Sequence, residues 1–369
     1  MTRHVDVAVI GGGQAGLATS YELTRRGLEH VVLDTAPEPG HAWRSRWDSL
    51  RLFTPAWFSA LPGLPFPGDP DAHPTKDQVA DYLAGYAARF ALPVRHGSEV
   101  TSIRRADGAF RVETATAAVG AAHVVVATGA FQRPVVPTLG AGAAPEVVQV
   151  HTAAYRRPAQ IPAGTVLVVG GGNSGLQVAV ELAGAGRRVV VAEGARATHL
   201  PQRFLARDVF RWLDAAGAYD VTPDSRRGRR MRGTQLVIGT SRRSLRQAGV
   251  ERRPRLAGLD GTRASFADGT ALEVDAVVWA TGFRTDHTFV DVERALDEHG
   301  VVRQRAGIGA APGLWTVGMP WQTTRGSALL GRVGPDAADV ADRIAGSVAG
   351  SAAASTAGTT ATRQRALAG

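Results

Sequence analysis

Short runs of apolar, largely β-branched residues recur along the chain, and two of them are followed at once by glycines and then by helical spacing. The runs at 5–10 (VDVAVI) and 166–169 (VLVV) are typical of buried strands in a parallel sheet. The spacing predicts a helix over 17–26 and a second strand over 31–33. Strands that alternate with helices predict an α/β fold.

The first strand runs into a glycine-rich turn of the form G-x-G-x-x-G. Gly11 permits a tight turn, Gly13 lets the backbone approach a pyrophosphate, and Gly16 lets the helix pack closely on the strand. The following helix directs its N-terminal N–H groups at the phosphates. Asp34 ends the next strand, where a carboxylate can accept a hydrogen bond from a ribose hydroxyl. This context, rather than the glycines alone, indicates a dinucleotide site.

The same pattern returns at a constant offset of 159 residues, since Gly170, Gly172 and Gly175 repeat the three glycines and Glu193 repeats Asp34. A degenerate copy that serves structure alone is disfavoured, because both copies keep all three glycines. Two sites imply two dinucleotides, of which the economical pair is a bound flavin dinucleotide and a nicotinamide dinucleotide that delivers hydride.

Two further segments, 123–129 (HVVVATG) and 276–282 (AVVWATG), are strands that end in Ala-Thr-Gly, one behind each glycine turn. They divide the chain into a discontinuous FAD domain, 1–160 and 284–349, and a nicotinamide domain, 161–283, inserted between its parts. Helices are predicted over 78–90 and 336–348. The Ser/Ala/Thr/Gly-rich segment 350–369 is expected to be a disordered tail.

Composition narrows the function. The 369 residues contain no cysteine, which excludes a redox dithiol, disulfides and cysteine-ligated metal sites. The histidines show no metal-ligand spacing, so no metal is expected. No apolar run is long enough to span a membrane, and the early first strand leaves no room for a signal peptide, so a cytoplasmic location is expected. The net charge of +9 is almost entirely arginine, and no motif supports nucleic-acid binding.

Several motifs together resemble a known group of proteins. They are GGGQAG (11–16), GHAWRSRWDSLRLFTP (40–55), HPTK (73–76), VVATG (125–129), HTAAY (151–155), GGGNSG (170–175), VVWATGF (277–283) and GLWTVGMPWQTTRGSALLG (313–331). The chain resembles the flavin-containing monooxygenase-like branch of flavoproteins with two dinucleotide-binding domains, and more closely the bacterial CzcO-like FAD-dependent oxidoreductases. The resemblance implies two Rossmann-like domains, the nicotinamide domain being inserted in the FAD domain.

The resemblance also implies the cofactor residues. FAD would be held around its phosphates, ribose, adenine and flavin ring by Gly11, Gly13, Gln14, Ala15, Gly16, Asp34, Gly40, Trp43, Arg44, Val100, Ala127, Thr128, Gly129, Gly318 and Ser327, with Ser327 at a helix start. The nicotinamide dinucleotide would be held by Gly170, Gly172, Asn173, Ser174, Gly175, Thr281 and Gly282. Thr54 would lie beside the flavin ring and is the one candidate catalytic side chain, because the flavin carries the chemistry.

Two departures from the family pattern affect the nicotinamide. Only His151 and Tyr155 survive from the second half of the monooxygenase fingerprint, since Pro145 and Val147 replace its Phe and first Gly. Glu193 would repel a 2′-phosphate, whereas Arg196 and Arg203 could bind one, so NADPH is favoured and NADH stays open. The remaining arginines between 226 and 255 are interpreted as a solvated basic surface in preference to a cofactor-attracting one.

The implied activity is that of an FAD-dependent, NADPH-using monooxygenase. It would form a C4a-(hydro)peroxyflavin with O2 and oxygenate a small organic substrate at nitrogen, sulfur or a carbonyl carbon. Two alternatives stay open: a reductase that passes flavin electrons to a quinone, metal or protein acceptor, and a nicotinamide-sensing regulator of transport. A homodimer is also left open.

Overall fold

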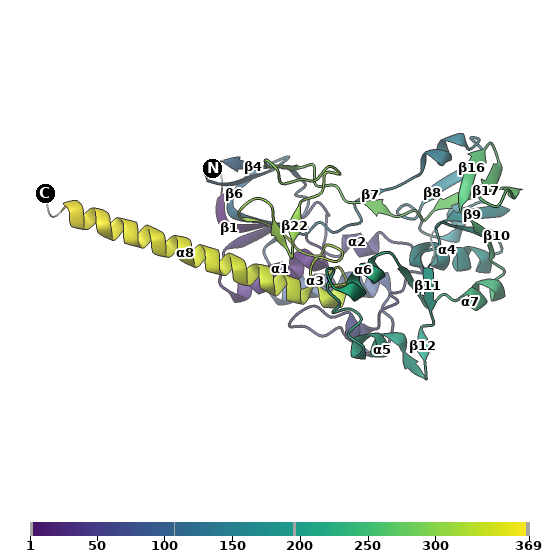
Figure 1. The fold of residues 1–369 in the computed structure, drawn as a ribbon, viewed down its shortest axis with the longest axis horizontal. Coiled ribbons are helices and arrows are strands. Elements are labelled where there is room, and N and C mark those ends of the chain that lie inside the picture. Colours follow the sequence, from purple (N-terminus) through teal and green to yellow (C-terminus); the bar gives the residue numbers. More distant parts are fainter. Residues whose placement is uncertain (1–2, 107, 195–196, 367–369) are drawn as a thin grey trace.

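The computed structural model describes residues 3–106, 108–194 and 197–366. Figure 1 shows two bodies side by side along the long axis of the molecule, each built around its own sheet. The chain forms the first body, crosses to the second, and returns to complete the first. This arrangement of two Rossmann-like units confirms the predicted α/β class.

The first sheet has ten strands in the order β21-β4-β5-β6-β1-β2-β3, with β24, β23 and β22 continuing from β6. The central strands β1, β2, β6 and β24 are parallel, and β4-β5-β6 is an antiparallel meander. The bounds are β1 Arg3–Ile10, β2 His30–Leu33, β3 Val94–Arg95, β4 Val100–Ala106, β5 Ala109–Thr114, β6 Ala118–Val126, β21 Val290–Asp291, β22 Gln304–Arg305, β23 Ile308–Gly309 and β24 Leu314–Thr316.

Helices cover the first sheet because they present apolar faces to it. α1 (Gln14–Arg25), α3 (Lys76–Arg89) and the start of α8 (Gly334–Ala366) share one core cluster with the sheet, which includes Leu17, Tyr86 and Ile344. α3 begins with a capping box, in which Thr75 accepts from the N–H of Gln78 and the Gln78 side chain accepts from the N–H of Thr75. Short helices α2 (His41–Arg44), η1 (Ala56–Phe58) and η4 (Leu330–Arg332) complete this body.

The second sheet has five parallel strands in the order β15-β10-β9-β19-β8. Their bounds are β8 Val148–His151, β9 Thr165–Val169, β10 Arg188–Glu193, β15 Glu251–Pro254 and β19 Ala276–Trp279. α4 (Asn173–Gly184) and α7 (Arg242–Gln247) pack near it, as do η2 (Thr138–Gly142), η3 (Pro158–Gln160) and a small sheet of β16 (Leu256–Asp260), β17 (Arg263–Phe266) and β18 (Ala271–Glu273). β8 joins this sheet although it precedes the boundary expected at 160/161, since it pairs with β19.

The chain passes between the two bodies twice, and the two passages are hydrogen-bonded to each other. β7 (Arg133–Pro134) leads out and β20 (Phe283–Arg284) leads back, and they form an antiparallel pair. Figure 1 shows β7 in the gap between the two bodies. The two passages therefore form one connecting ribbon.

A segment of the second body reaches back to the first. We call residues 201–234 the bridging lobe; they lie between β11 (Ala197–Leu200) and β14 (Gln235–Ile238), which pair with each other. The lobe contains a hairpin of β12 (Arg203–Phe204) and β13 (Arg207–Asp208) and the helices α5 (Val209–Ala215) and α6 (Arg226–Arg232). Phe210 and Tyr219 of the lobe pack on Phe58 of the first body.

The predicted helix over 336–348 is part of α8, which begins at Gly334 and has its last residue at Ala366. Residues 367–369 lie outside the described part of the chain. Alanine has the highest helix propensity, so the Ala-rich composition that suggests low complexity also permits a helix to continue.

Candidate functional site

The first glycine turn lies at the carboxyl end of β1, between β2 and β6. The N–H of Gly11 donates to the carbonyl of Leu33 over 2.8 Å, and the N–H of Ala127 donates to that of Ile10 over 2.8 Å. Gly11 has φ +102°, and a Cβ there would lie 2.8 Å from the Ala127 carbonyl oxygen. The turn therefore needs glycine at position 11 both for its backbone angle and for its contact with the Ala-Thr-Gly segment.

The second turn repeats these contacts. The N–H of Gly170 donates to the carbonyl of Ala192 over 2.9 Å, and that of Ala280 donates to Val169 over 2.8 Å. Gly170 has φ +122°, and a Cβ there would lie 2.3 Å from the Ala280 carbonyl oxygen. The second Ala-Thr-Gly segment thus covers its glycine turn as the first does, which accounts for their pairing in the sequence.

The first turn leaves space around its second motif glycine, where a dinucleotide pyrophosphate would lie. A Cβ on Gly13 would meet no atom within 4 Å. Gly16 differs, since a Cβ there would lie 1.8 Å from the Gly11 carbonyl oxygen, and Gly175 meets Gly170 in the same way at 2.0 Å. No side chain caps the start of α1 or α4, so their first N–H groups face the open side of the turns.

The acid that follows each second strand packs on the middle glycine of its turn. A Cβ on Gly12 would lie 2.6 Å from Asp34 Oδ2, and one on Gly171 would lie 2.9 Å from Glu193 Cγ. Asp34 is mostly buried, and His96 Nδ1 lies 4.0 Å from its Oδ2. Asp34 is therefore held beside the first turn.

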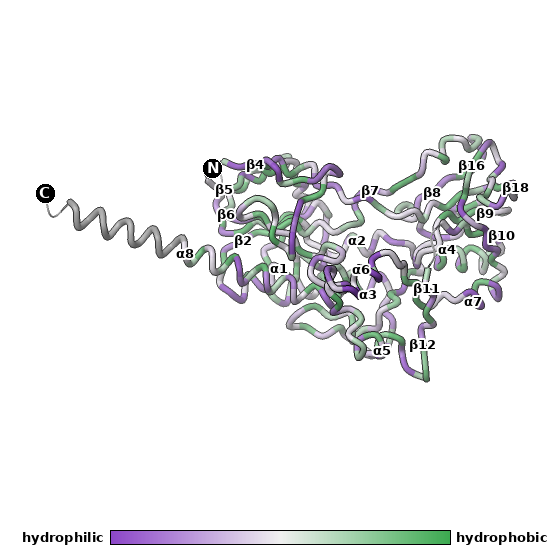
Figure 2. The backbone as a smooth tube through the Cα atoms, in the orientation of Figure 1, coloured by the Kyte–Doolittle hydropathy of each residue, from purple (hydrophilic) through white to green (hydrophobic). Residues whose placement is uncertain are grey.

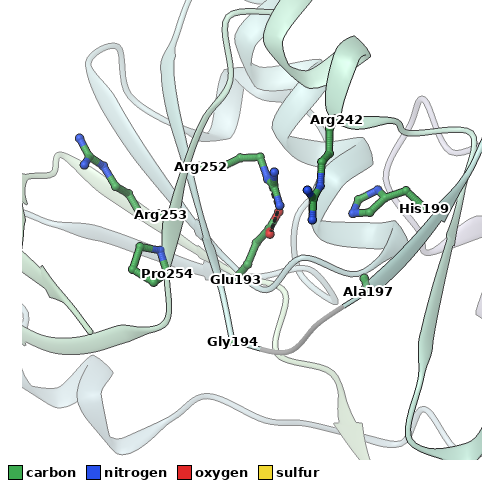
Figure 3. A pocket seen from close by; sticks show the side chains of 8 residues that line it. All are labelled: Glu193, Gly194, Ala197, His199, Arg242, Arg252, Arg253 and Pro254. Carbon is green, nitrogen blue, oxygen red and sulfur yellow. Dashed lines mark hydrogen bonds and ion pairs between the residues drawn. The ribbon is translucent and has the colours of Figure 1, made fainter. Parts of the chain in front are cut away.

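A cavity of about 620 Å³ opens beyond β10, at the end of the second Rossmann unit. It is lined by Glu193, Gly194, Ala197, His199, Arg242, Arg252, Arg253 and Pro254. Figure 3 shows the Arg252 guanidinium paired with the Glu193 carboxylate. The Arg242 side chain points towards this pair and towards His199. Arg252 Nε lies 2.7 Å from Glu193 Oε1, and Arg252 Nη2 contacts Glu193 Oε2. These bonds raise the pKa of Arg252 above its usual value, although burial opposes them.

The arginines around this cavity differ from those expected. Arg196 lies outside the described residues. Arg203 lies on the β12–β13 hairpin and lines a different cavity, of about 580 Å³, beside His73 and Asp208. Arg242, Arg252 and Arg253, which the sequence assigned to a solvated surface, line the cavity instead. The parallel pairing of β15 with β10, which sets Arg253 beside Ala192, joins segments too distant for local pattern to predict.

Side chains around the second turn have structural partners of their own. The Asn173 amide donates to the carbonyl of Leu236 over 2.9 Å and accepts from the N–H of Ile238 over 3.0 Å. Asn173 therefore ties α4 to β14, and only its backbone N–H faces the turn. Ser174 is exposed beside it, and Gly172 is the N-cap of α4.

The returning segment 313–331 lies against the first turn. Gly318 has φ +85°, and a Cβ there would lie 2.6 Å from Ala15 Cβ. Gln14 Nε2 donates to the carbonyl of Ala328 over 2.8 Å. Ser327 is fully buried and its Oγ accepts from the N–H of Thr324 over 3.0 Å, so it closes a turn. The expected helix start at Ser327 is wrong, because α8 begins only at Gly334 after this turn and η4.

The segment after β2 packs on α3. Gly40 has φ +74°, and a Cβ there would lie 2.6 Å from the Ala80 carbonyl oxygen. Trp43 is partly buried against the core of the first body. Arg44 Nη2 donates to Asp81 over 2.7 Å, so this guanidinium already has a carboxylate partner. Val100 starts β4, partly buried beside the second core cluster.

Thr54 lies on the loop before η1, where the bridging lobe meets the first body. It is buried, and its Oγ1 lies 2.9 Å from Ser59 Oγ, which in turn lies 2.9 Å from the carbonyl oxygen of Pro55. Since Ser59 has one hydroxyl proton and the Pro55 carbonyl only accepts, Ser59 Oγ can accept the Thr54 proton while it donates to Pro55. The neighbouring rings of Phe53 and Phe58 lie 6.1 Å and 5.0 Å from that of Phe210. Aromatic packing thus covers the loop that carries Thr54.

Both Ala-Thr-Gly segments are tied to the connecting ribbon. Thr128 Oγ1 lies 3.2 Å from Nε2 of the buried His287, whose Nδ1 accepts from the N–H of Val302 over 3.1 Å. Burial lowers the pKa of His287 to about 4. Gly129 follows with φ +71°.

The second Ala-Thr-Gly segment, 280–282, is likewise hydrogen-bonded to residues from the outgoing part of the chain. Thr281 Oγ1 donates to the carbonyl of Val135, and His151 Nε2 donates to that of Gly282 over 3.0 Å. Burial lowers the pKa of His151, which keeps its ring neutral at pH 7. His151, singled out by the half-preserved fingerprint, therefore holds the returning passage in place.

Comparison with known proteins agrees with this geometry. A family model described as pyridine nucleotide-disulphide oxidoreductase matches residues 8–205. An oxidoreductase named CzcO-like from Geobacillus kaustophilus is 40% identical, over 91% of this chain and 97% of that protein. An indole-3-pyruvate monooxygenase of Oryza sativa is 29% identical over 91% of this chain and 90% of that protein. A flavin-containing monooxygenase structure from Stenotrophomonas maltophilia has a TM-score of 0.80 at 29% identity, covering 94% of this chain and 100% of that one.

The paired turns and these relatives define an FAD-dependent oxidoreductase of the monooxygenase class. The chain belongs to the pyridine nucleotide-disulphide oxidoreductase family, within which it groups with the CzcO-like oxidoreductases and flavin monooxygenases. It has no cysteine, so it does not carry out the dithiol chemistry in the family's name. Within the described residues, no helix is long and apolar enough to cross a membrane, and no group of His, Asp or Glu could hold a metal ion.

Proposed function

We propose that the protein is an NADPH-dependent monooxygenase that inserts one oxygen atom of O2 into a small organic substrate at nitrogen, sulfur or a carbonyl carbon. FAD would bind at the first turn and NADPH at the second. When bound, the flavin accepts hydride from the nicotinamide and activates O2. The side chains of the protein then bind and orient both dinucleotides and keep water from the reaction.

The first turn fits FAD. The open side of Gly13 and the uncapped start of α1 accommodate the pyrophosphate, and Asp34 accepts from the adenosine ribose. Gly318 packs on Ala15 and so brings the returning segment against the first turn of α1. These features of the first body support the proposal that FAD binds there.

The preference for NADPH rests on one observation, the ion pair between Arg252 and Glu193. A free carboxylate at the end of β10 would repel a 2′-phosphate, but Arg252 holds both oxygens of Glu193 and balances its charge. Arg242 has no carboxylate partner in the described part of the chain, and it points into the same cavity (Figure 3). This leaves the Arg242 guanidinium for a phosphate.

Thr54 is the candidate for a direct contact with the reacting atoms. Its buried hydroxyl shares a hydrogen bond with Ser59 Oγ, which also reaches the carbonyl of Pro55, and this chain orients the hydroxyl for a bound flavin or oxygen species. The aromatic side chains around Phe58 and Phe210 exclude water from this loop. Exclusion of water protects the reaction, because water entry would divert O2 to hydrogen peroxide.

The test is anaerobic reduction of the purified yellow protein by NADPH and by NADH, followed by mixing with oxygenated buffer. We expect NADPH to reduce the flavin at lower concentration than NADH. We also expect a delay before the oxidised spectrum returns. Immediate return with stoichiometric hydrogen peroxide, and no label from ¹⁸O2 in the products of a panel of amines, sulfides and ketones, would favour the reductase over the monooxygenase.

A further inference from the structure

The β12–β13 hairpin of the bridging lobe exposes large apolar side chains. Phe204 is 53% exposed and Leu205 is 69% exposed at its tip, and Trp212 on the adjoining α5 is 40% exposed. Figure 1 shows the hairpin projecting from the lower edge of the molecule, and Figure 2 shows a hydrophobic tip. Large exposed apolar side chains gathered on one projection indicate a surface that meets a partner.

The turn at the tip is built from residues that its geometry disfavours. Leu205 and Ala206 have φ of +48° and +61°, so both central positions of this two-residue turn are left-handed. Hairpins of this type ordinarily place Asn, Asp or Gly at these positions, because a Cβ is strained there. A leucine at a strained and exposed position stabilises neither the turn nor the core, and its apolar side chain is therefore left free to meet another surface.

The hairpin is attached to α5 and is flanked by basic side chains. Trp212 Nε1 donates to the carbonyl of Phe204 over 3.0 Å, and the two rings meet edge to face at 6.2 Å. Arg203, Arg207 and Arg211 flank the tip. The nearby carboxylates are already bound, since Asp208 pairs with His73 at 2.9 Å and Asp71 pairs with Arg211 at 2.8 Å. The hairpin thus combines an apolar tip with a net positive base.

We propose that this hairpin is a peripheral docking site for an anionic lipid surface. Leu205 and Phe204 would insert among the acyl chains, the Trp212 ring would lie at the headgroup level, and Arg203 and Arg207 would contact lipid phosphates. A second copy of the chain is a poorer occupant, because a symmetric contact would oppose the arginines of two hairpins on a protein of net charge +9. This inference is independent of the oxygenation chemistry.

The test uses the full-length, flavin-bound protein and sedimentation with lipid vesicles. We expect binding to vesicles of phosphatidylcholine with about one third phosphatidylglycerol, weak binding to phosphatidylcholine alone, and release by salt. Equal sedimentation with and without the anionic vesicles would overturn the proposal.

Paired variants separate insertion from misfolding. Phe204→Ser with Leu205→Asn removes the apolar tip, and asparagine tolerates the left-handed turn. It should lower affinity for the anionic vesicles about tenfold or more while flavin absorbance and the melting temperature stay unchanged. The matched control is Ile308→Ser, which removes an apolar side chain that is 41% exposed on β23 and should bind as the wild type does. Undiminished binding by the double variant would refute insertion at this tip.

Replacing one arginine beside the hairpin tests the contribution of charge. Arg207→Gln should lower affinity for the anionic vesicles about fivefold, whereas Arg263→Gln, at an exposed position that begins β17, should not. Sedimentation velocity without lipid measures the oligomeric state and so tests whether the tip instead joins two copies of the chain. A dimer that becomes monomeric in the double variant would assign the tip to contact between copies and overturn the lipid proposal.

Discussion

Single glycines have separable roles in the two turns. Gly11 and Gly170 are required by the protein itself, since each has a positive φ and lies under an alanine carbonyl. Gly13 has a negative φ and open space around it, so the fold would accept a side chain there. Glycine at position 11 is therefore required by the backbone itself, whereas on the proposed function glycine at position 13 leaves room for the dinucleotide.

This difference predicts two distinct phenotypes. Gly11→Ala should destabilise the protein by about 2 kcal/mol or more and lower its flavin content, because of backbone strain and the clash with Ala127. Gly13→Ala should retain the melting temperature of the apoprotein but bind FAD more weakly. Differential scanning fluorimetry and the flavin absorbance per chain measure both. Gly13→Ala melting as low as Gly11→Ala would contradict the assignment.

The Arg252–Glu193 pair predicts a change in cofactor preference. Arg252→Gln leaves a charged Glu193 facing the bound 2′-phosphate, so KM for NADPH should rise about tenfold or more. KM for NADH should change little, because NADH has no such phosphate. Steady-state oxidation of each nucleotide measures the ratio. Arg263→Gln, which removes an exposed arginine remote from the cavity, is the control, and an equal rise for both nucleotides would count against the pair.

At the scale of elements, local sequence patterns were sufficient to predict the strands and helices around the two glycine turns. The apolar runs, the glycine turns and the helical spacing correctly predicted β1, α1, α3, β9 and α4 to within a few residues. They were sufficient because each signal lies within one turn or one strand. The pairing of β15 with β10 depends on contacts between distant segments, so the sequence did not predict that Arg252 reaches Glu193. The turn closed by Ser327 likewise depends on packing from several segments.

His287 links the first Ala-Thr-Gly segment to the returning chain and predicts a pH dependence. Its pKa of about 4 in the folded protein lies below the ordinary 6.5, because burial disfavours the charged ring. The unfolded chain therefore binds more protons between pH 6.5 and 4, and stability is lost as pH falls through this range. The loss from this one residue is about 3 kcal/mol.

Melting temperatures measured from pH 8 to pH 4.5 check this expectation. His287→Asn should weaken the decline below pH 6.5, since no imidazole remains to be protonated at that site. His299→Asn is the matched control, because this ring is 77% exposed and should leave the decline unchanged. An identical decline in the wild type and in His287→Asn would exclude His287 as its source.

At the scale of the whole molecule, the bridging lobe joins the two bodies away from the connecting ribbon. The carbonyls of Tyr219 and Val221 accept from the N–H groups of Gly326 and Arg325 over 2.9 Å each. Arg332 forms ion pairs with Asp214 and with Asp220. The sequence placed this segment in the nicotinamide domain, because chain order does not reveal which body a segment packs against.

The aromatic cluster of Phe58, Phe210 and Tyr219 predicts that one substitution lowers both the stability of the protein and its exclusion of water. Phe210→Ala should cost about 3–5 kcal/mol of stability, since the ring is fully buried against Phe58 and Tyr219. It should also raise the hydrogen peroxide released per NADPH consumed, because water would reach the loop of Thr54. Phe266→Ala removes an equally buried ring from β17 of the second body. This control should lose comparable stability without added peroxide, and equal peroxide from both variants would contradict the role of the lobe.

The pairing of β7 with β20 determines how the two bodies could be separated by a deletion. Pro134 and Phe283 lie opposite each other, so the chain leaves and re-enters the first body at one place. Deleting 135–282 leaves two ends that a hairpin loop of about two residues would rejoin. With the apolar surface at Phe58 made polar, the remainder is a candidate stand-alone flavoprotein. The same junction makes residues 135–282 a unit that a single deletion at one place in the first body would remove.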